Sequence, residues 1–237
     1  MFKKQLAVAL ASACLSVSAF ASDSHGHGDV QSPVAAFINH LSVDNAAFIS
    51  AHNPGYFAEL AKGQHPKATV VSCSDSRVQT TAFDKTPEDE LFMVRDIGNQ
   101  MSTAEGSVEY GVHHLHTPIL LFVGHSRCGA INAAASDYSK ESEPIKRELD
   151  TISIAKGVQN MDGVKTNVNN QVAAARKKFA DEVKEGHLMV IGAVYDFADD
   201  MKLGAGKLNI INVNGETDPA RLRDINALTA KSAHAHH

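Results

Sequence analysis

Two short apolar segments, each followed directly by polar and reactive residues, constrain the fold of this chain most strongly. Residues 68–71 (ATVV) precede Cys73-Ser-Asp-Ser-Arg77, and residues 119–123 (ILLFV) precede Gly124-His-Ser-Arg-Cys128-Gly. Short apolar runs rich in β-branched residues and bounded by turn residues are typical of buried strands in a parallel sheet. Because ligands of open α/β sheets bind at the carboxyl ends of the strands, the pattern predicts that both motifs lie at one edge of the sheet.

The residue types in these motifs predict a metal site. Cys73, His125 and Cys128 offer two thiolates and an imidazole, a donor set that suits a catalytic Zn²⁺ with an open fourth position. Cys73, Asp75 and Arg77 alternate, so in an extended strand they project to the same side. A disulfide is the alternative for two cysteines of a secreted protein. The Asp-Arg pair and the histidine at short spacing beside the cysteines favour the metal.

The motifs resemble the zinc site of the β-class carbonic anhydrases, and matching segments extend from about residue 34 to residue 215. The further segments are Gln64, residues 92–99 (FMVRDIGN), 107–110 (SVEY), 192–196 (GAVYD) and 206–208 (GKL). The resemblance implies a single α/β domain with a mostly parallel central sheet of four strands plus an edge strand. Helices would flank this sheet, and a helical arm would precede it.

The same resemblance implies an enzyme that reversibly hydrates CO₂ to bicarbonate and a proton by attack of zinc-bound hydroxide. Cys73, His125 and Cys128 would hold the Zn²⁺. Asp75 would either accept a hydrogen bond from the hydroxide or bind the metal as a fourth ligand, and the sequence leaves both states open. A buried carboxylate needs a partner, so Arg77 is expected to pair with Asp75 and keep it ionised.

The resemblance also implies roles for three further residues. Gln64 would donate an amide hydrogen to a substrate oxygen, while Phe92 and Tyr110 would line an apolar pocket. The alternatives are an ordinary surface glutamine and ordinary core aromatics. Arg95 and Asn99 are expected to be structural.

Other functions remain open at this point. A protein with the same metal site could hydrolyse another small substrate such as carbon disulfide, or could be a non-enzymatic zinc-binding module. Arg127 lies inside the second motif, where it would face either bicarbonate or solvent. The chain has no Trp, which argues against the bicarbonate-regulated subgroup of the resembled family.

The N-terminal segment of the chain predicts export. Residues 1–21 combine two lysines, an apolar run and Ala19-Phe-Ala21, which is typical of a signal peptide cleaved after Ala21 and directs the protein to the periplasm. Residues 22–32 are predicted to be a disordered polar tether, residues 33–226 the α/β domain and residues 227–237 a histidine-containing tail. The formal net charge of −5 does not favour a nucleic-acid partner. No segment is long and apolar enough to be expected to span a membrane.

Hydrophobic periodicity predicts the remaining elements. Residues 33–62 are predicted to form two or three short helices with more apolar surface than they can bury alone. Together with the resemblance, this arm predicts a homodimer or tetramer. The resemblance also implies that pocket residues come from both subunits. The expected strands are residues 68–73, 91–95, 118–124, 187–194 and 208–213. The expected helices are residues 104–116, one beginning near Cys128, and residues 144–156 and 168–184.

Overall fold

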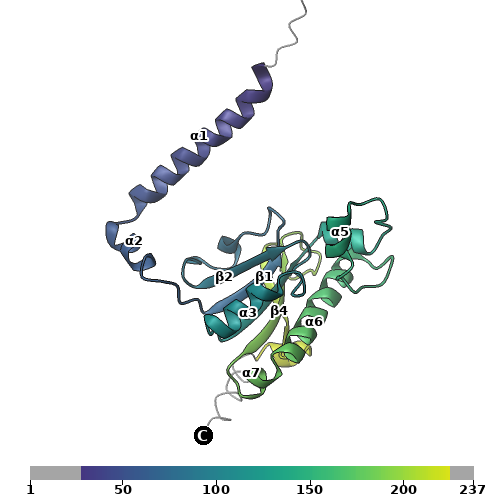
Figure 1. Cartoon of the computed structure of the whole chain (residues 1–237). Helices are drawn as coiled ribbons and strands as arrows, with labels where there is room; N and C mark the ends of the chain where they lie inside the picture. Colours follow the sequence, from purple (N-terminus) through teal and green to yellow (C-terminus); the bar gives the residue numbers. More distant parts are fainter. Residues whose placement is uncertain (1–27, 225–237) are drawn as a thin grey trace, which may run out of the picture. The chain divides into compact units, whose positions relative to one another are not determined.

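The computed structural model describes residues 28–224 (Figure 1). The predicted signal peptide and C-terminal tail therefore lie outside the described residues. The chain divides into two compact units between Ala58 and Glu59. The first contains most of the helical arm and the second contains the sheet.

A five-stranded sheet forms the centre of the second unit. Its strands are β1 (Ala68–Cys73), β2 (Leu91–Asp96), β3 (Ile119–His125), β4 (Met189–Asp196) and β5 (Lys207–Val213). They lie in the order β2-β1-β3-β4-β5, with the first four parallel and β5 antiparallel to β4. All six residues of β1 are buried, as expected for a parallel strand covered on both faces. The predicted mostly parallel sheet with one edge strand is confirmed.

Seven helical segments accompany the sheet in the described part of this unit. They are α3 (Glu105–Glu109), its π-helical continuation η2 (Tyr110–His114), α4 (Gly129–Ala134), α5 (Glu143–Leu149), α6 (Asn160–Lys178), α7 (Ala180–Lys184) and α8 (Pro219–Leu222). A short 3₁₀ turn, η1 (Thr80–Ala82), follows the first motif.

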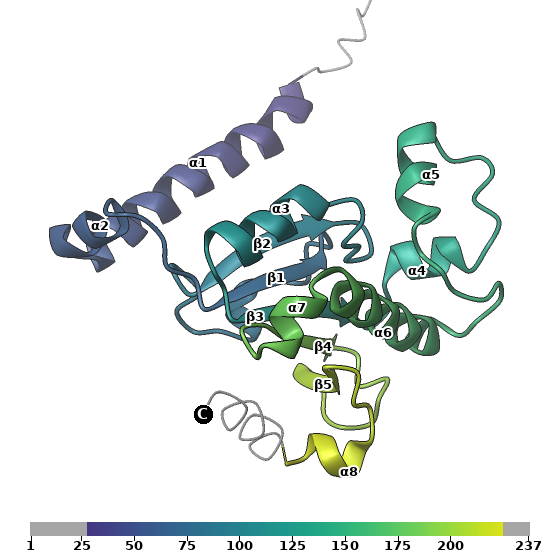
Figure 2. The same cartoon turned by 60° about the horizontal axis from the view of Figure 1, so that its bottom comes forward.

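The longest of these helices, α6, packs closely on β3 and β4 (Figure 2). Gly124 of β3 and Gly192 of β4 make this approach possible. A Cβ at either glycine would lie 2.7 or 2.6 Å from a methyl group of Val168, closer than packed atoms tolerate. The glycines therefore fix the distance between α6 and the strand that ends in His125.

Two predicted helices have other boundaries. The helix expected over residues 144–156 ends at Leu149. The helix expected over residues 168–184 begins at Asn160 and is interrupted at Phe179. The first turns of this helix are mostly polar, and their buried apolar residues are Val164 and Val168, which are four residues apart. This short apolar pattern did not predict the helix start. Phe179 leaves the helical backbone conformation (φ −106°, ψ 42°), and its side chain is 1% exposed in the core.

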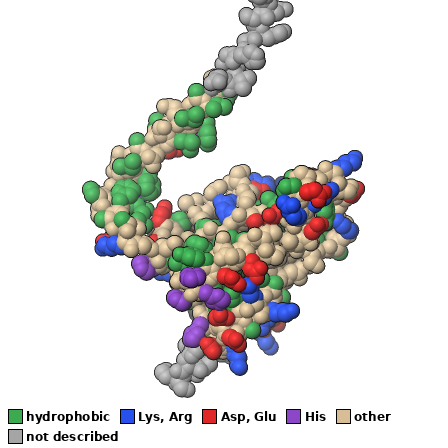
Figure 3. Space-filling view, in the orientation of Figure 1, with side chains coloured by type: hydrophobic (Ala, Val, Ile, Leu, Met, Phe, Trp, Pro, Cys, Tyr) green, Lys and Arg blue, Asp and Glu red, His purple; other side chains and the backbone are tan. Residues whose placement is uncertain are grey.

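The arm consists of α1 (Gly28–Ala51) and α2 (Pro54–Leu60). The arm predicted over residues 33–62 is helical and contains two helices, but the first is longer than expected, with 24 residues, because no Gly or Pro interrupts residues 34–51. The helix also begins inside the predicted tether. Its apolar side chains are exposed, with Phe37 at 60% and Leu41 at 54% (Figure 3). Among the described residues, no helix is both long and apolar enough to cross a membrane.

Candidate metal centre

Three metal-binding side chains meet at the carboxyl ends of β1 and β3. One ligand atom from each of Cys73, His125 and Cys128 lies within 4.8 Å of the others. Cys73 and His125 end neighbouring parallel strands, and Cys128 precedes the first residue of α4. All three are at most 5% exposed, and both cysteines are free thiols. The structure therefore assembles the predicted donor set, and it does not pair the cysteines in a disulfide.

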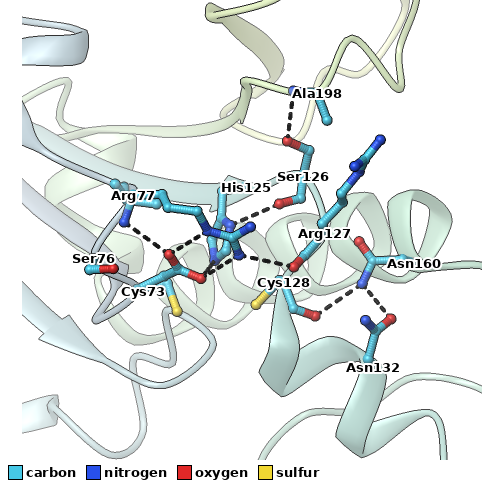
Figure 4. Close-up of polar contacts among 12 residues, drawn as sticks. Cys73, Ser76, Arg77, His125, Ser126, Arg127, Cys128, Asn132, Asn160 and Ala198 are labelled. Atoms are coloured by element: carbon cyan, nitrogen blue, oxygen red, sulfur yellow. Dashed lines mark hydrogen bonds and ion pairs between the residues drawn. The ribbon is translucent and has the colours of Figure 1, made fainter.

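The protonation of His125 favours metal binding. Its Nδ1 lies 3.0 Å from the carbonyl oxygen of Ser126 (Figure 4). A carbonyl oxygen only accepts hydrogen bonds, so Nδ1 carries the proton and Nε2 has a free lone pair. This Nε2 is buried and lacks a hydrogen-bond partner. A buried polar atom without a partner is costly, and a metal ion would satisfy it.

The two thiols affect each other's pKa. The Cys128 thiol donates a hydrogen bond to Cys73 and lowers the pKa of Cys73 to about 4. The same interaction, together with burial, raises the pKa of Cys128. The backbone N–H of Gly98 also points at the Cys73 sulfur, at 3.5 Å. Cys73 is therefore ready to bind a cation, and binding would release the proton of Cys128.

Asp75 and Arg77 form a two-point ion pair beside these donors. Arg77 Nε donates to Asp75 Oδ1 at 2.9 Å, and Arg77 Nη2 donates to Oδ2 at 2.7 Å. These bonds hold the pKa of the Asp75 carboxyl well below its usual range. Asp75 Oδ2 also lies 3.9 Å from His125 Nε2. The ionised carboxylate therefore stands next to the place where the donors would hold a metal.

The pair is less buried than we expected. In this chain the Arg77 side chain is 49% exposed and that of Asp75 is 17% exposed. The strands end here, so solvent reaches the guanidinium. Half-exposed ion pairs contribute about 1 kcal/mol or less to folding. The arginine therefore matters more for the orientation of Asp75 than for stability.

Arg95 stabilises the loop that carries the dyad. Its guanidinium donates to the carbonyl oxygens of Cys73 at 3.0 Å, Asp75 at 2.9 Å and Val78 at 2.7 Å. Asn99 is 1% exposed and adopts φ +52° in the turn that presents Gly98 to Cys73. These contacts give both residues the structural roles that we predicted.

An apolar cavity of about 410 Å³ opens onto Cys73 and Asp75. The residues that line it and that sequence reasoning did not single out are Ile97, Gly129, Ala130, Ala133, Ile145 and Leu149, with Ser74 and Glu141 as polar members. Ala130 and Ala133 are three residues apart in the helix that follows Cys128, so they lie on the same helix face. This spacing could have predicted that both line the site. A small nonpolar molecule could reach the donors through this cavity.

Comparison with known proteins agrees with this geometry. A family model described as carbonic anhydrase matches residues 68–203, which is more than half of the chain and includes all three donors. The chain belongs to the β-class carbonic anhydrases.

Relatives with this name align over most of their length. Carbonic anhydrase 2 of Mycobacterium tuberculosis is 28% identical over 187 residues, covering 70% of this chain and 90% of the relative. Carbonic anhydrase of Mycolicibacterium smegmatis is 29% identical with the same coverage. Among solved structures, a tetrameric β-carbonic anhydrase of Sordaria macrospora gives a TM-score of 0.60 at 26% identity, covering 75% of this chain and 98% of that chain. The Coccomyxa β-carbonic anhydrase in complex with acetazolamide gives 0.58 at 25% identity, covering 81% and 90%.

Three predicted site residues of this carbonic anhydrase lie away from the donors of their own chain. Gln64 is exposed and precedes β1, whereas Cys73 ends it. The strand alone spans about 17 Å at roughly 3.3 Å per residue. Phe92 pairs with Thr69 near the start of β1, and its ring lies 5.9 Å from that of Tyr110. Within one chain these residues do not line the cavity that contains Cys73.

Arg127 of the carbonic anhydrase faces away from the donors in Figure 4. Its side chain is 65% exposed, and its Nη2 lies 3.6 Å from Asp200 Oδ1. Its backbone adopts φ +55°, and its carbonyl oxygen accepts a hydrogen bond from Arg77 at 3.3 Å. In the described structure, Arg127 therefore supports the dyad through its backbone and directs its charge to solvent.

Proposed function

We propose that this protein is a Zn²⁺-dependent enzyme that interconverts CO₂ and bicarbonate. The observation that carries the proposal is the buried Cys73–His125–Cys128 group, in which His125 Nε2 has no hydrogen-bond partner. Two thiolates and one imidazole are donors that Zn²⁺ prefers, and three protein ligands leave a fourth position open. When bound, Zn²⁺ would supply a water whose pKa is lowered to about 7.

Asp75 provides the acceptor that orients the attacking water. Arg77 holds both carboxylate oxygens, so Asp75 stays ionised and its direction is fixed. An ionised carboxylate accepts a proton or a hydrogen bond and cannot donate one. The apolar walls of the cavity, including Ile97 and Leu149, would accept CO₂ and exclude competing polar ligands.

We also propose that a second copy of the chain completes the site. Gln64, Phe92 and Tyr110 lie at the amino-terminal end of the sheet, so they can act on a metal only if it belongs to another chain. The exposed apolar side chains of α1 require a covering surface, since such patches mark interaction sites. The related Sordaria macrospora enzyme is described as tetrameric. A homodimer or a pair of dimers fits these observations.

Mixing two inactive variants should restore activity if Gln64 acts on the partner's metal. Gln64→Ala keeps the metal donors, and Cys73→Ser keeps the glutamine. A mixed dimer then contains one site with intact donors and an intact partner glutamine. Unfolding and refolding the two variants together at equal concentration should yield mixed dimers, which we expect to recover about a quarter of wild-type CO₂ hydration, because half of the dimers would carry one good site.

The matched control is the double variant Gln64→Ala/Cys73→Ser refolded with wild-type protein. In its mixed dimers, the intact metal site faces an alanine, so they should be inactive. Wild-type homodimers should therefore leave this control with about a quarter of wild-type activity. About half of wild-type activity in the control, with none in the first mixture, would show that Gln64 acts within its own chain. Light scattering would verify the assembly in both mixtures.

Stopped-flow measurement of CO₂ hydration tests the proposed reaction itself. Protein carrying one zinc per chain should accelerate hydration, and a chelator that removes the zinc should abolish the acceleration. Zinc-loaded protein without activity would contradict the proposal.

A further inference from the structure

An aromatic side chain outside the predicted site contacts two of its members. Phe197 follows β4 and is half-buried. Its ring is stacked on that of His125, with centroids 6.0 Å apart and an interplanar angle of 27°. The Arg77 guanidinium carbon lies 4.7 Å from the Phe197 ring centroid. Phe197 thus contacts one metal donor and the arginine of the dyad.

The loop around Phe197 is held firmly. The Ala198 N–H donates to Ser126 Oγ at 3.3 Å (Figure 4). The buried Asp196 carboxylate accepts the N–H groups of Asp200 at 3.1 Å and Met201 at 2.7 Å. Tyr195 packs edge-on against the ring at 5.7 Å. The ring is therefore a fixed surface and does not simply follow the position of Arg77.

Arg77 needs such a surface. Its side chain is long and half exposed, yet both oxygens of Asp75 depend on one orientation of its guanidinium. A guanidinium is attracted to the face of an aromatic ring and keeps its N–H groups free at the edge. Those groups are the ones bonded to Asp75 and to the Arg127 carbonyl oxygen.

We propose that Phe197 is a positioning residue that keeps Arg77 on Asp75, so that the carboxylate does not occupy the fourth metal position. Asp75 Oδ2 lies only 3.9 Å from His125 Nε2, so a carboxylate released by the arginine has a metal ligand position within reach. The inference rests on the proposed metal site and adds a residue that controls whether this site is open.

Thiocyanate binding to the Co²⁺-loaded protein tests this role without measuring CO₂ hydration. The anion needs an open metal position, and its binding changes the visible absorption of the cobalt. Phe197→Leu keeps an apolar side chain but removes the aromatic face. We expect it to weaken thiocyanate binding by about two- to fivefold, the range that an exposed cation–π contact supplies. Phe197→Tyr keeps the face and should bind thiocyanate like the wild type.

A double-mutant cycle separates positioning from a general structural effect. In an Asp75→Asn background the fourth position has no competing carboxylate, so Phe197→Leu should leave thiocyanate binding unchanged. The inference would be overturned if Phe197→Leu bound thiocyanate with wild-type affinity, or if it weakened binding equally in the Asp75→Asn background. It would also be overturned if thiocyanate did not change the cobalt spectrum of the wild-type protein. A wild-type protein that binds cobalt and thiocyanate but does not hydrate CO₂ would overturn only the proposed function.

Discussion

Replacing Cys73 or Cys128 with serine is expected to remove both bound zinc and CO₂ hydration. A serine hydroxyl stays protonated at neutral pH and is a poor Zn²⁺ ligand, whereas the hydrogen bond from Cys128 lowers the pKa of the Cys73 thiol. Two remaining donors do not hold the ion in a tetrahedral site with an open position. Activity should fall to the uncatalysed rate.

Elemental analysis of purified protein measures this loss directly. Wild-type protein should carry one zinc per chain, and each serine variant far less. Ser76→Ala is the matched control, because Ser76 lies in the same loop as Cys73 but is exposed and outside the cavity lining. It should keep both zinc and activity. One zinc per chain in either cysteine variant would mean that the donor set is wrong.

Replacing Asp75 with asparagine should keep the zinc and lower turnover by about 100-fold or more, the usual contribution of a positioned acid–base group. The amide has one oxygen in place of two acceptors, and its NH₂ group would face either Arg77 or the reacting water. The free energy of unfolding should change little, because the Arg77 side chain that loses its charged partner is half exposed.

Stopped-flow rates, zinc content and thermal melting of this variant give the three readouts. Asp200→Asn is the control, since Asp200 is an exposed carboxylate beside Arg127 and outside the cavity lining. It should hydrate CO₂ like the wild type. Unchanged turnover in Asp75→Asn would show that the carboxylate has no part in the reaction.

The sheet and the metal donors could be predicted because both follow from local sequence patterns. Apolar runs identify parallel strands, and the rule that ligands bind at their carboxyl ends brings Cys73 and His125 together. The strand length also shows that Gln64 lies at the opposite end of β1 from Cys73, which fits the expectation from the resemblance that pocket residues come from both subunits. Because Gln64 and Cys73 lie at opposite ends of β1, Gln64 can reach a metal site only in a second chain.

Other features depend on contacts that sequence patterns do not encode. The exposure of Arg77 is set by where neighbouring strands end, so the expected pairing with Asp75 forms but only the carboxylate is largely buried. Phe197 reaches the site from the loop after β4, more than a hundred residues from Arg77 in sequence, and no periodicity marks it. The start of α6 was missed because polar residues surround the buried pair Val164 and Val168.

The most direct test of the account is stopped-flow CO₂ hydration by wild-type protein that carries one zinc per chain. It should be measured at pH 7 and pH 9, with zinc-loaded Asp75→Asn alongside. We expect the wild-type protein to hydrate CO₂ well above the uncatalysed rate at pH 7, at pH 9 or at both. This activity should be lost when zinc is removed and restored when zinc is added. No acceleration at either pH by fully zinc-loaded, folded protein would contradict it.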